Sequence, residues 1–178
     1  MKSLRLARWR ARVSPTWPPG IRDWLRTKGS LTVRLQTERG RFRVENVFQA
    51  LTVGLSDERG VLDEGRVLKG RGRDVFLWSG GQRSVYAHSL IAWHGARCDW
   101  RFWRALGQRS LGSELFRDRT IERGPARFAC LGGAHPLARA AGLTAAAVLY
   151  ARRTRYRRRG GRTPLLVTEV FLPAIQTL

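Results

Sequence analysis

A glutamate inside an otherwise apolar strand is the first residue whose chemistry needs an explanation. The segment LLVTEVFLP, residues 165–173, alternates its side chains between two faces, and both faces are mostly apolar, with Glu169 as the one charged residue. Burying a carboxylate without a partner costs on the order of several kcal/mol, so Glu169 needs a cation, a raised pKa or a ligand. Such groups cluster at functional sites, although an exposed edge strand or a structural ion pair would also explain it.

Arg73 raises the matching question on another strand. It precedes the apolar run DVFLW in phase with Val75 and Leu77, which places its side chain on the core side. A solvated arginine is the commoner alternative in so basic a chain. A guanidinium can hold a carboxylate through its planar fork while an acid meets a hydroxyl, so Arg73 and Glu169 together predict a substrate with two polar ends.

The segment Gly107–Gly112, GQRSLG, offers a third element. Ser110 is a candidate N-cap, and the unpaired backbone N–H groups at a helix start favour anions, although an ordinary capped helix is commoner. His88, His94 and His135 have neither triad nor metal spacing, and the chain lacks GxSxG and phosphate-binding glycine motifs. Hydrolase, metal-dependent and nucleotide-dependent reactions are therefore not favoured.

The stretch Arg152–Arg162 packs seven arginines around one tyrosine. This composition suits nucleic-acid phosphates, and a solvated strand and turn is the alternative. The whole chain shares the bias, because 34 Lys and Arg residues against 13 acids give a net charge of +21. Such a charge attracts nucleic acid, anionic surfaces and anionic substrates alike, so it does not choose among them.

Length and composition limit the remaining classes. The 178 residues fit one compact domain, and the longest apolar stretch, 140–151, is shorter than the roughly 20 residues of a membrane span. Two cysteines, Cys98 and Cys130, without CxxC spacing indicate reduced thiols in a cytoplasm. Residues 1–20 are basic and proline-rich and lack a signal-peptide core, so we interpret them as a mobile N-terminal arm before a domain at 21–178.

Hydrophobic periodicity and turn residues predict the elements that must position these groups. We expect an α+β fold, a single domain with an antiparallel sheet of about six strands and short helices packed around it. The clearest element is a β-hairpin over 73–93, with its turn at Ser79–Gln82. The other predictions are a helix over 21–28, an antiparallel pair of strands over 31–35 and 42–44, two short helices over 99–118, a loop plus a short helix over 124–149, and strands over 151–157 and 164–173 joined at Gly160–Gly161.

Four segments carry a family likeness that extends over nearly the whole chain from Trp24. They are WLRTKGSLTVRL, RDVFLWSGGQRSVYAHS, LGQRSLGSELF and ARRTRYRRRGGRTPLLVTEVFLPA. The chain resembles the chorismate pyruvate-lyase (chorismate lyase) family in the order and spacing of these segments. The resemblance implies cleavage of chorismate into 4-hydroxybenzoate and pyruvate without a cofactor, the first committed step toward ubiquinone. It also implies an antiparallel sheet with an enclosed product pocket.

The resemblance assigns roles to four residues. Arg73 matches the arginine that holds the ring carboxylate, and Glu169 matches the glutamate that meets the ring hydroxyl, which makes them the expected catalytic residues. Leu31 and Leu111 match positions that bind the substrate through backbone N–H groups. His88 departs from the pattern, because it stands where related sequences can carry an arginine. The stretch 124–150 also departs from it, and no role is carried over to it.

Two other functions compete with a lyase. One is a non-catalytic module that binds small aromatic acids on the same fold, as in sensors of transcription regulators. The other is a basic nucleic-acid-binding protein that uses the Arg-rich hairpin with Trp9 or Trp17. For the lyase we expect chorismate as substrate, 4-hydroxybenzoate as product, a cytoplasmic monomer, no metal and no requirement for nucleic acid.

Overall fold

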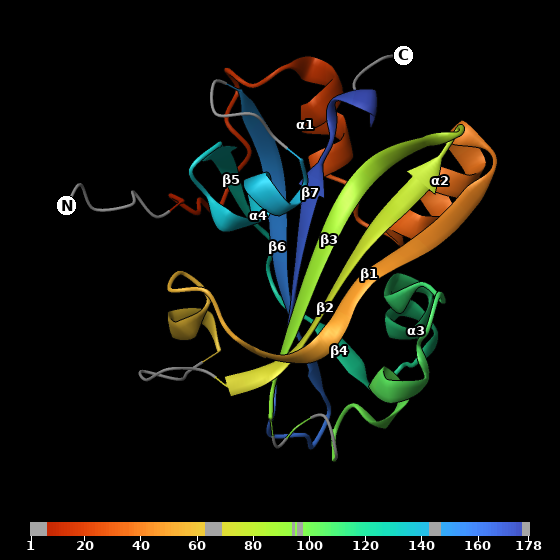
Figure 1. Cartoon of the computed structure of the whole chain (residues 1–178), viewed down its shortest axis with the longest axis vertical. Helices are drawn as coiled ribbons and strands as arrows, with labels where there is room; N and C mark the ends of the chain where they lie inside the picture. The colour runs from red at the N-terminus through yellow and green to blue at the C-terminus, as the bar shows by residue number, and fades with distance from the viewer. Residues whose placement is uncertain (1–6, 63–68, 94, 96–97, 143–146, 176–178) are drawn as a thin grey trace.

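The computed structural model describes residues 7–62, 69–93, 95, 98–142 and 147–175. They form the expected α+β fold around one antiparallel sheet of seven strands, in the order β1-β2-β3-β7-β6-β4, with β5 also paired to β6 (Figure 1). The strands are β1 (Phe42–Val53), β2 (Lys69–Ser79), β3 (Gln82–Ala92), β4 (Ile121–Arg123), β5 (Arg127–Gly132), β6 (Val148–Arg158) and β7 (Leu165–Phe171).

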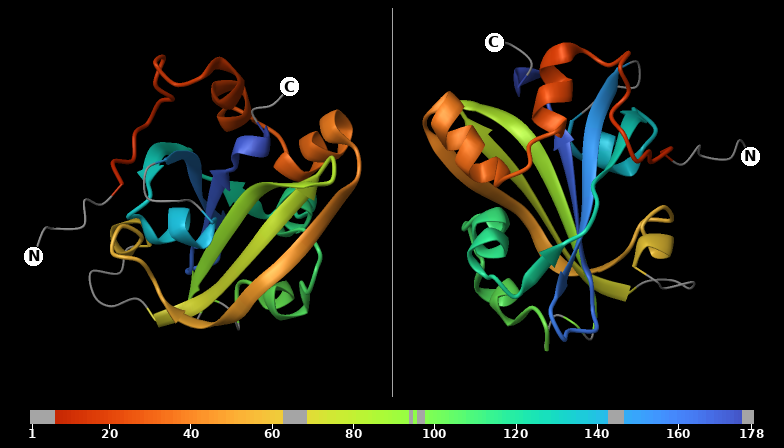
Figure 2. Two further views of the ribbon diagram at one scale, coloured as in Figure 1. Left: turned by 45° about the horizontal axis from the view of Figure 1, so that its top comes forward. Right: turned by 180° about the vertical axis from the view of Figure 1, so that it is seen from behind.

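Short helices cover both faces of the sheet. They are α1 (Pro19–Leu25), α2 (Leu31–Arg39), α3 (Leu111–Arg117) and α4 (Pro136–Ala140), with the 3-10 turns η1 (Arg59–Val61), η2 (Arg101–Ala105) and η3 (Pro173–Ile175). Figure 2 shows α1, α2 and α3 together on one side of the sheet, here called the α2–α3 face. The opposite side, the α4 face, carries α4 and η1. No helix of the described residues is long and apolar enough to cross a membrane.

Neighbouring side chains of a β-strand point to opposite faces of the sheet, so the charged residues of one strand line cavities on both faces. On β6, Arg152 lines a pocket on the α2–α3 face, while Arg153 and Arg155 line a groove on the α4 face. Apolar layers bury both faces. Trp24 and Leu35 pack on the α2–α3 face, and Leu137 packs on the α4 face. Polar side chains within these layers therefore need partners.

Both predicted hairpins are confirmed. Gly80 and Gly81 join β2 to β3 with φ angles of 57° and 79°, the left-handed conformation that a two-residue turn requires. The hairpin of β6 and β7 pairs Arg152 with Glu169. The predicted helices over 21–28 and 99–118 are present as α1, η2 and α3.

The predicted strand over 31–35 is wrong, because this segment forms α2. Ser30 caps the helix by accepting a hydrogen bond from the Val33 backbone N–H at 3.4 Å. Leu31 and Leu35, four residues apart, share the buried side of the helix, while Val33 is 57% exposed. Alternation over so short a segment does not distinguish a strand from a helix. The strand that begins at Phe42 pairs with β2 instead.

Two other segments differ from expectation. Residues 124–149 contain the strand β5, which pairs with β6, in addition to the predicted short helix. The described part of the basic N-terminal segment packs on the domain, because Arg10 forms a β-bridge with Phe128 and Val13 is buried. The boundary at residue 20 remains a prediction, and residues 1–6 lie outside the described ranges.

Candidate active site

A small, partly enclosed pocket lies between the α2–α3 face of the sheet and the starts of helices α2 and α3. Its volume is about 40 Å³, room for about three water molecules. All four sequence-predicted site residues line it: Leu31, Arg73, Leu111 and Glu169. Residues far apart in the sequence thus meet in one cavity, as the substrate-pocket hypothesis requires.

Arg73 is buried in the wall of this pocket without an anionic partner among the described residues. Its Nη2 atom donates to the carbonyls of Gly107 and Arg109, both at 2.9 Å, and the residue is 1% exposed. Its Nε atom is buried and has no hydrogen-bond partner within the described ranges. Burial lowers the pKa of Arg73 to about 10, because the charge is desolvated. A guanidinium in this state favours any anion that reaches it.

Glu169 does have a cationic partner, Arg152. The Nε atom of Arg152 donates to the Glu169 carboxylate at 2.6 Å, and its Nη1 atom donates to the Thr27 carbonyl at 2.7 Å. The exposed fractions of the two side chains are 3% and 15%. Burial opposes the charge of Arg152, but the adjacent Glu169 carboxylate outweighs it and raises the pKa of Arg152. The ion pair with Arg152 fixes the orientation of the Glu169 carboxylate in the pocket.

Two helix N-termini meet at the pocket. Leu31 and Leu111 are the first residues of α2 and α3, positions whose backbone N–H groups have no acceptor within the helix. Ser110 caps α3 and shares a hydrogen bond of 2.6 Å with the Thr32 hydroxyl, which joins the two helix starts. Gly112 keeps the approach close, because a Cβ atom there would lie 3.1 Å from the Thr32 hydroxyl oxygen.

The sheet register fixes the separation of the two charged residues. Arg73 pairs with Ser89, and Glu169 pairs with Ala87, so the residues lie two strands and two positions apart. Strand spacing and rise then place their Cα atoms about 12 Å apart. Apolar side chains occupy the interval, among them Val75 and Val167. A six-membered ring with one polar group at each end matches this arrangement.

His88 does not reach the pocket. Its side chain lies on the α4 face, where Nδ1 is 2.5 Å from an Asp74 carboxylate oxygen and Nε2 is 3.3 Å from a Glu58 carboxylate oxygen. Burial opposes protonation of the imidazole, but these carboxylates outweigh it and raise the pKa of His88 to about 9. The position where relatives can carry an arginine therefore serves an internal ion-pair cluster in this chain.

The sequence did not predict two of the residues that line the pocket, Arg152 and Tyr156. The Arg-rich stretch was open to interpretation as a solvated strand, yet both residues are at least 90% buried. Burial raises the pKa of Tyr156 to about 12, with a contribution from the Glu169 charge. The predicted turn at Gly160–Gly161 contained the information, because residues equally distant from a hairpin turn pair with each other. This rule places Arg152 opposite Glu169 and Tyr156 opposite Leu165, as the structure shows. Within the described ranges, no three His, Cys, Asp or Glu side chains could hold a metal ion together.

Comparisons with known proteins place the chain in one family. A family model described as chorismate lyase matches residues 4–177. The probable chorismate pyruvate-lyase of Cupriavidus pinatubonensis is 41% identical over 168 residues, 92% of this chain and 86% of that protein. The probable chorismate pyruvate-lyase of Nitrosospira multiformis is 37% identical over 182 aligned positions, 100% of this chain and 99% of that protein.

Solved structures of transcription regulators share the fold at much lower identity. The effector domain of PhnF from Mycobacterium smegmatis has a TM-score of 0.57 at 14% identity, covering 82% of this chain and 90% of that one. A GntR-family regulator from Bacillus cereus has a TM-score of 0.55 at 10% identity, covering 75% and 92%. At these identities the likeness concerns the fold alone.

Proposed function

The chain belongs to the chorismate lyase family, and we propose that its lyase reaction takes place in the partly enclosed pocket, with Arg73 and Glu169 holding opposite ends of the substrate ring. The enzyme is a carbon–oxygen lyase that converts chorismate to 4-hydroxybenzoate and pyruvate on the ubiquinone pathway. The observation that supports the proposed site is the buried Arg73 guanidinium, whose Nε atom has no hydrogen-bond partner in the described part of the chain.

The ring carboxylate binds at Arg73 in this proposal. A carboxylate there gives the buried Nε atom an acceptor and neutralises a desolvated charge. The backbone N–H groups of Leu31 and Leu111 add donors from the two helix starts, where the helix dipoles also favour negative charge. Because Arg73 holds the carbonyls of Gly107 and Arg109, it also fixes the segment that leads into α3.

Glu169 accepts a hydrogen bond from the ring hydroxyl at the other end. Arg152 is a positioning residue, since its bond to the carboxylate at 2.6 Å and its bond to the Thr27 carbonyl fix the direction of the acceptor. The apolar walls between the two ends exclude water, which strengthens both charged contacts.

The chemical step is an elimination that balances within the substrate. The ether C–O bond breaks, a ring hydrogen moves to the enolpyruvyl methylene to give pyruvate, and the ring becomes aromatic as 4-hydroxybenzoate. No net oxidation occurs and no external electron pair is needed. Glu169 and Arg73 hold the ring in the reactive geometry and stabilise charge as the C–O bond opens.

Substrate access requires the pocket to widen, because a cavity of about 40 Å³ is far below the several hundred Å³ of ordinary ligand pockets. Phe116 of the short helix α3 lines the pocket and is 43% exposed, so its rotation can open a path. The product retains the carboxylate and hydroxyl contacts, and we expect its release to limit turnover.

Incubation of the purified protein with chorismate tests the proposal directly. Equal molar amounts of 4-hydroxybenzoate and pyruvate should form with EDTA present, and Arg73→Ala and Glu169→Ala should each lower kcat/KM at least tenfold, as loss of a charge-assisted contact does. Near-normal turnover by both variants would refute the assigned site.

The setting of the reaction is part of the same proposal. We propose a cytoplasmic monomer, and the free thiols Cys98 and Cys130 support a reducing compartment. Light scattering on a gel-filtration column measures the mass, and a particle of twice the mass of the 20.2 kDa chain would contradict the monomer.

A further inference from the structure

Chorismate carries a second carboxylate, on the enolpyruvyl group that leaves as pyruvate. The ether that holds this group is on the ring carbon next to the one with the hydroxyl, so in the proposed site the second carboxylate lies near Glu169. Two negative charges close together in a pocket that excludes water repel each other strongly. The charge of Arg152 is already compensated by Glu169, so the second carboxylate needs another cation.

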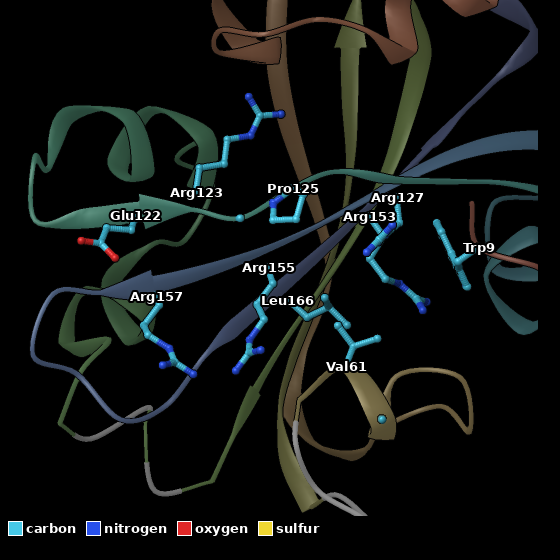
Figure 3. A pocket seen from close by; sticks show the side chains of 12 residues that line it. Trp9, Val61, Glu122, Arg123, Pro125, Arg127, Arg153, Arg155, Arg157 and Leu166 are labelled. Carbon is cyan, nitrogen blue, oxygen red and sulfur yellow. The ribbon is translucent and has the colours of Figure 1, made fainter. Parts of the chain in front are cut away.

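Arg123 is the cation that the sheet register brings to this side of the pocket. It lies on β4 directly opposite Tyr156 on β6, and directly opposite residues project their side chains from the same face of a sheet. Tyr156 lines the lyase pocket, so the Arg123 side chain belongs to the α2–α3 face. Figure 3, a view of the groove on the α4 face, shows Arg123 directed the opposite way from Arg155 and Arg157.

The Arg123 side chain extends toward the ion pair of Arg152 and Glu169. Its Nη1 atom donates to the Lys28 carbonyl, which is next along the chain to the Thr27 carbonyl that accepts a hydrogen bond from Arg152. Two guanidinium groups that bind adjacent backbone carbonyls are close neighbours. Arg123 therefore lies beside the end of the pocket where the ring hydroxyl binds in the proposed site.

Arg123 has no acidic partner among the described residues. Besides its bond to the Lys28 carbonyl, its guanidinium lies 5.7 Å from the ring centre of Phe116 and bonds to the Tyr156 hydroxyl. Burial raises the pKa of Tyr156 and the Glu169 charge adds to this rise, whereas the Arg123 charge acts against it. The Tyr156 hydroxyl is thus close both to the acid that holds the substrate and to a cation that no acid compensates.

Two further features favour an anion at this end of the pocket. Thr154 lies between Arg152 and Tyr156 on the same face of β6, is 2% exposed, and has a buried hydroxyl without a hydrogen-bond partner in the described part of the chain. A hollow of about 250 Å³ adjoins the lyase pocket at Arg152, and three other cationic residues line it, Arg123 among them, but no acid. An enolpyruvyl group therefore finds both room and donors beside the ring.

We propose that Arg123 binds the enolpyruvyl carboxylate of chorismate, with the hydroxyl groups of Tyr156 and Thr154 as further donors; this inference rests on the proposed lyase site. A guanidinium can meet a carboxylate through two parallel N–H bonds, so Arg123 fixes the direction of the ether as well as compensating its charge. With Arg73 on the ring carboxylate and Glu169 on the hydroxyl, the site distinguishes chorismate from aromatic monocarboxylates.

Two ligands that differ by one ether-linked carboxylate test the proposal by calorimetry. They are 4-hydroxybenzoate and 3-(carboxymethoxy)-4-hydroxybenzoate, in which the added carboxylate takes the place of the enolpyruvyl carboxylate. The test variant is Arg123→Gln, and the matched control is Arg127→Gln, an exposed arginine of β5 with the same change of charge. We expect Arg123→Gln to bind the dicarboxylate at least tenfold more weakly and 4-hydroxybenzoate within twofold of the wild type. The control should change neither affinity by more than twofold.

Turnover of chorismate gives the second measurement. The kcat/KM of Arg123→Gln should fall at least tenfold, chiefly through a higher KM, because the enolpyruvyl carboxylate keeps its charge throughout the reaction. Arg123→Lys keeps the charge without the fork and should recover part of the loss.

The pair of ligands separates a substrate contact from a structural role. Equal weakening of both ligands by Arg123→Gln would leave Arg123 a structural residue only, and an unchanged affinity for the dicarboxylate would exclude the contact; either result overturns the proposal. Failure of the wild type to bind 4-hydroxybenzoate would instead refute the lyase pocket on which the inference rests.

Discussion

Replacement of Glu169 by Gln separates its catalytic role from its structural one. The substitution keeps an acceptor oxygen but removes the charge that compensates Arg152, which is buried to 3% exposure. Breaking a buried pair on one side costs about 3–5 kcal/mol of unfolding free energy. The contact with the substrate hydroxyl is a second loss, of about 1.5–3 kcal/mol, which corresponds to roughly a 10- to 150-fold drop in kcat/KM.

A double variant distinguishes the two losses. Arg152→Met in the Glu169→Gln background removes the uncompensated cation and leaves an apolar side chain of similar length. Urea unfolding should then recover most of the lost stability, because neither partner remains buried with a charge. The rate of 4-hydroxybenzoate formation should stay low, because the acceptor for the ring hydroxyl is still weakened. Recovery of both stability and turnover would refute a substrate contact by Glu169 and leave it a structural role only.

Three further predictions concern other residues of the same architecture. Arg73→Lys keeps the charge but loses the fork, so calorimetry should show an at least tenfold weaker affinity for 4-hydroxybenzoate; a change below twofold would contradict the carboxylate contact. Ser110→Ala removes the cap of α3 and its bond to Thr32, and should cost about 1 kcal/mol in urea unfolding and lower product affinity severalfold. His88, whose pKa rises from 6.5 to about 9 on folding, contributes stability that is complete below pH 6.5 and lost as pH rises through 9. The free energy of unfolding of the wild type should therefore fall by up to about 3 kcal/mol over this pH interval relative to that of His88→Gln. Parallel pH profiles of the two proteins would exclude this linkage.

The site residues that could be predicted from the sequence are charged residues that disagree with the apolar pattern of their strands. Arg73 and Glu169 stand out because each interrupts an apolar strand, and period-two alternation is a local property that needs no knowledge of neighbouring strands. The structure buries Arg73 and brings both residues to the same cavity. The hairpin turn at Gly80 and Gly81 could also be predicted from the sequence, because such turns need positive φ angles that residues other than glycine rarely adopt.

What the sequence left unresolved depends on long-range partners. Whether the segment from Leu31 forms a strand or a helix is decided by the cap at Ser30 and by the packing of Leu31 and Leu35 under α2, which alternation over five residues does not specify. Arg152 resembles its six neighbouring arginines until the register sets it opposite Glu169. Strand β5 exists because it adds to the edge of β6, and its own sequence, RFACLG, carries little β signal.

The three buried arginines of the described structure explain why the lyase pocket needs a ligand. Arg152 pairs with Glu169, and Arg153 pairs with Asp57, so these two buried cations are compensated within the fold. Arg73 is buried to the same degree, yet among the described residues only backbone carbonyls accept hydrogen bonds from it and its Nε atom has no partner. A buried charge without a counter-ion lowers stability, and it persists where a bound anion supplies the missing partner. In the proposed site the carboxylate of chorismate is that partner, so a bound substrate or product should raise the stability of the protein in urea unfolding.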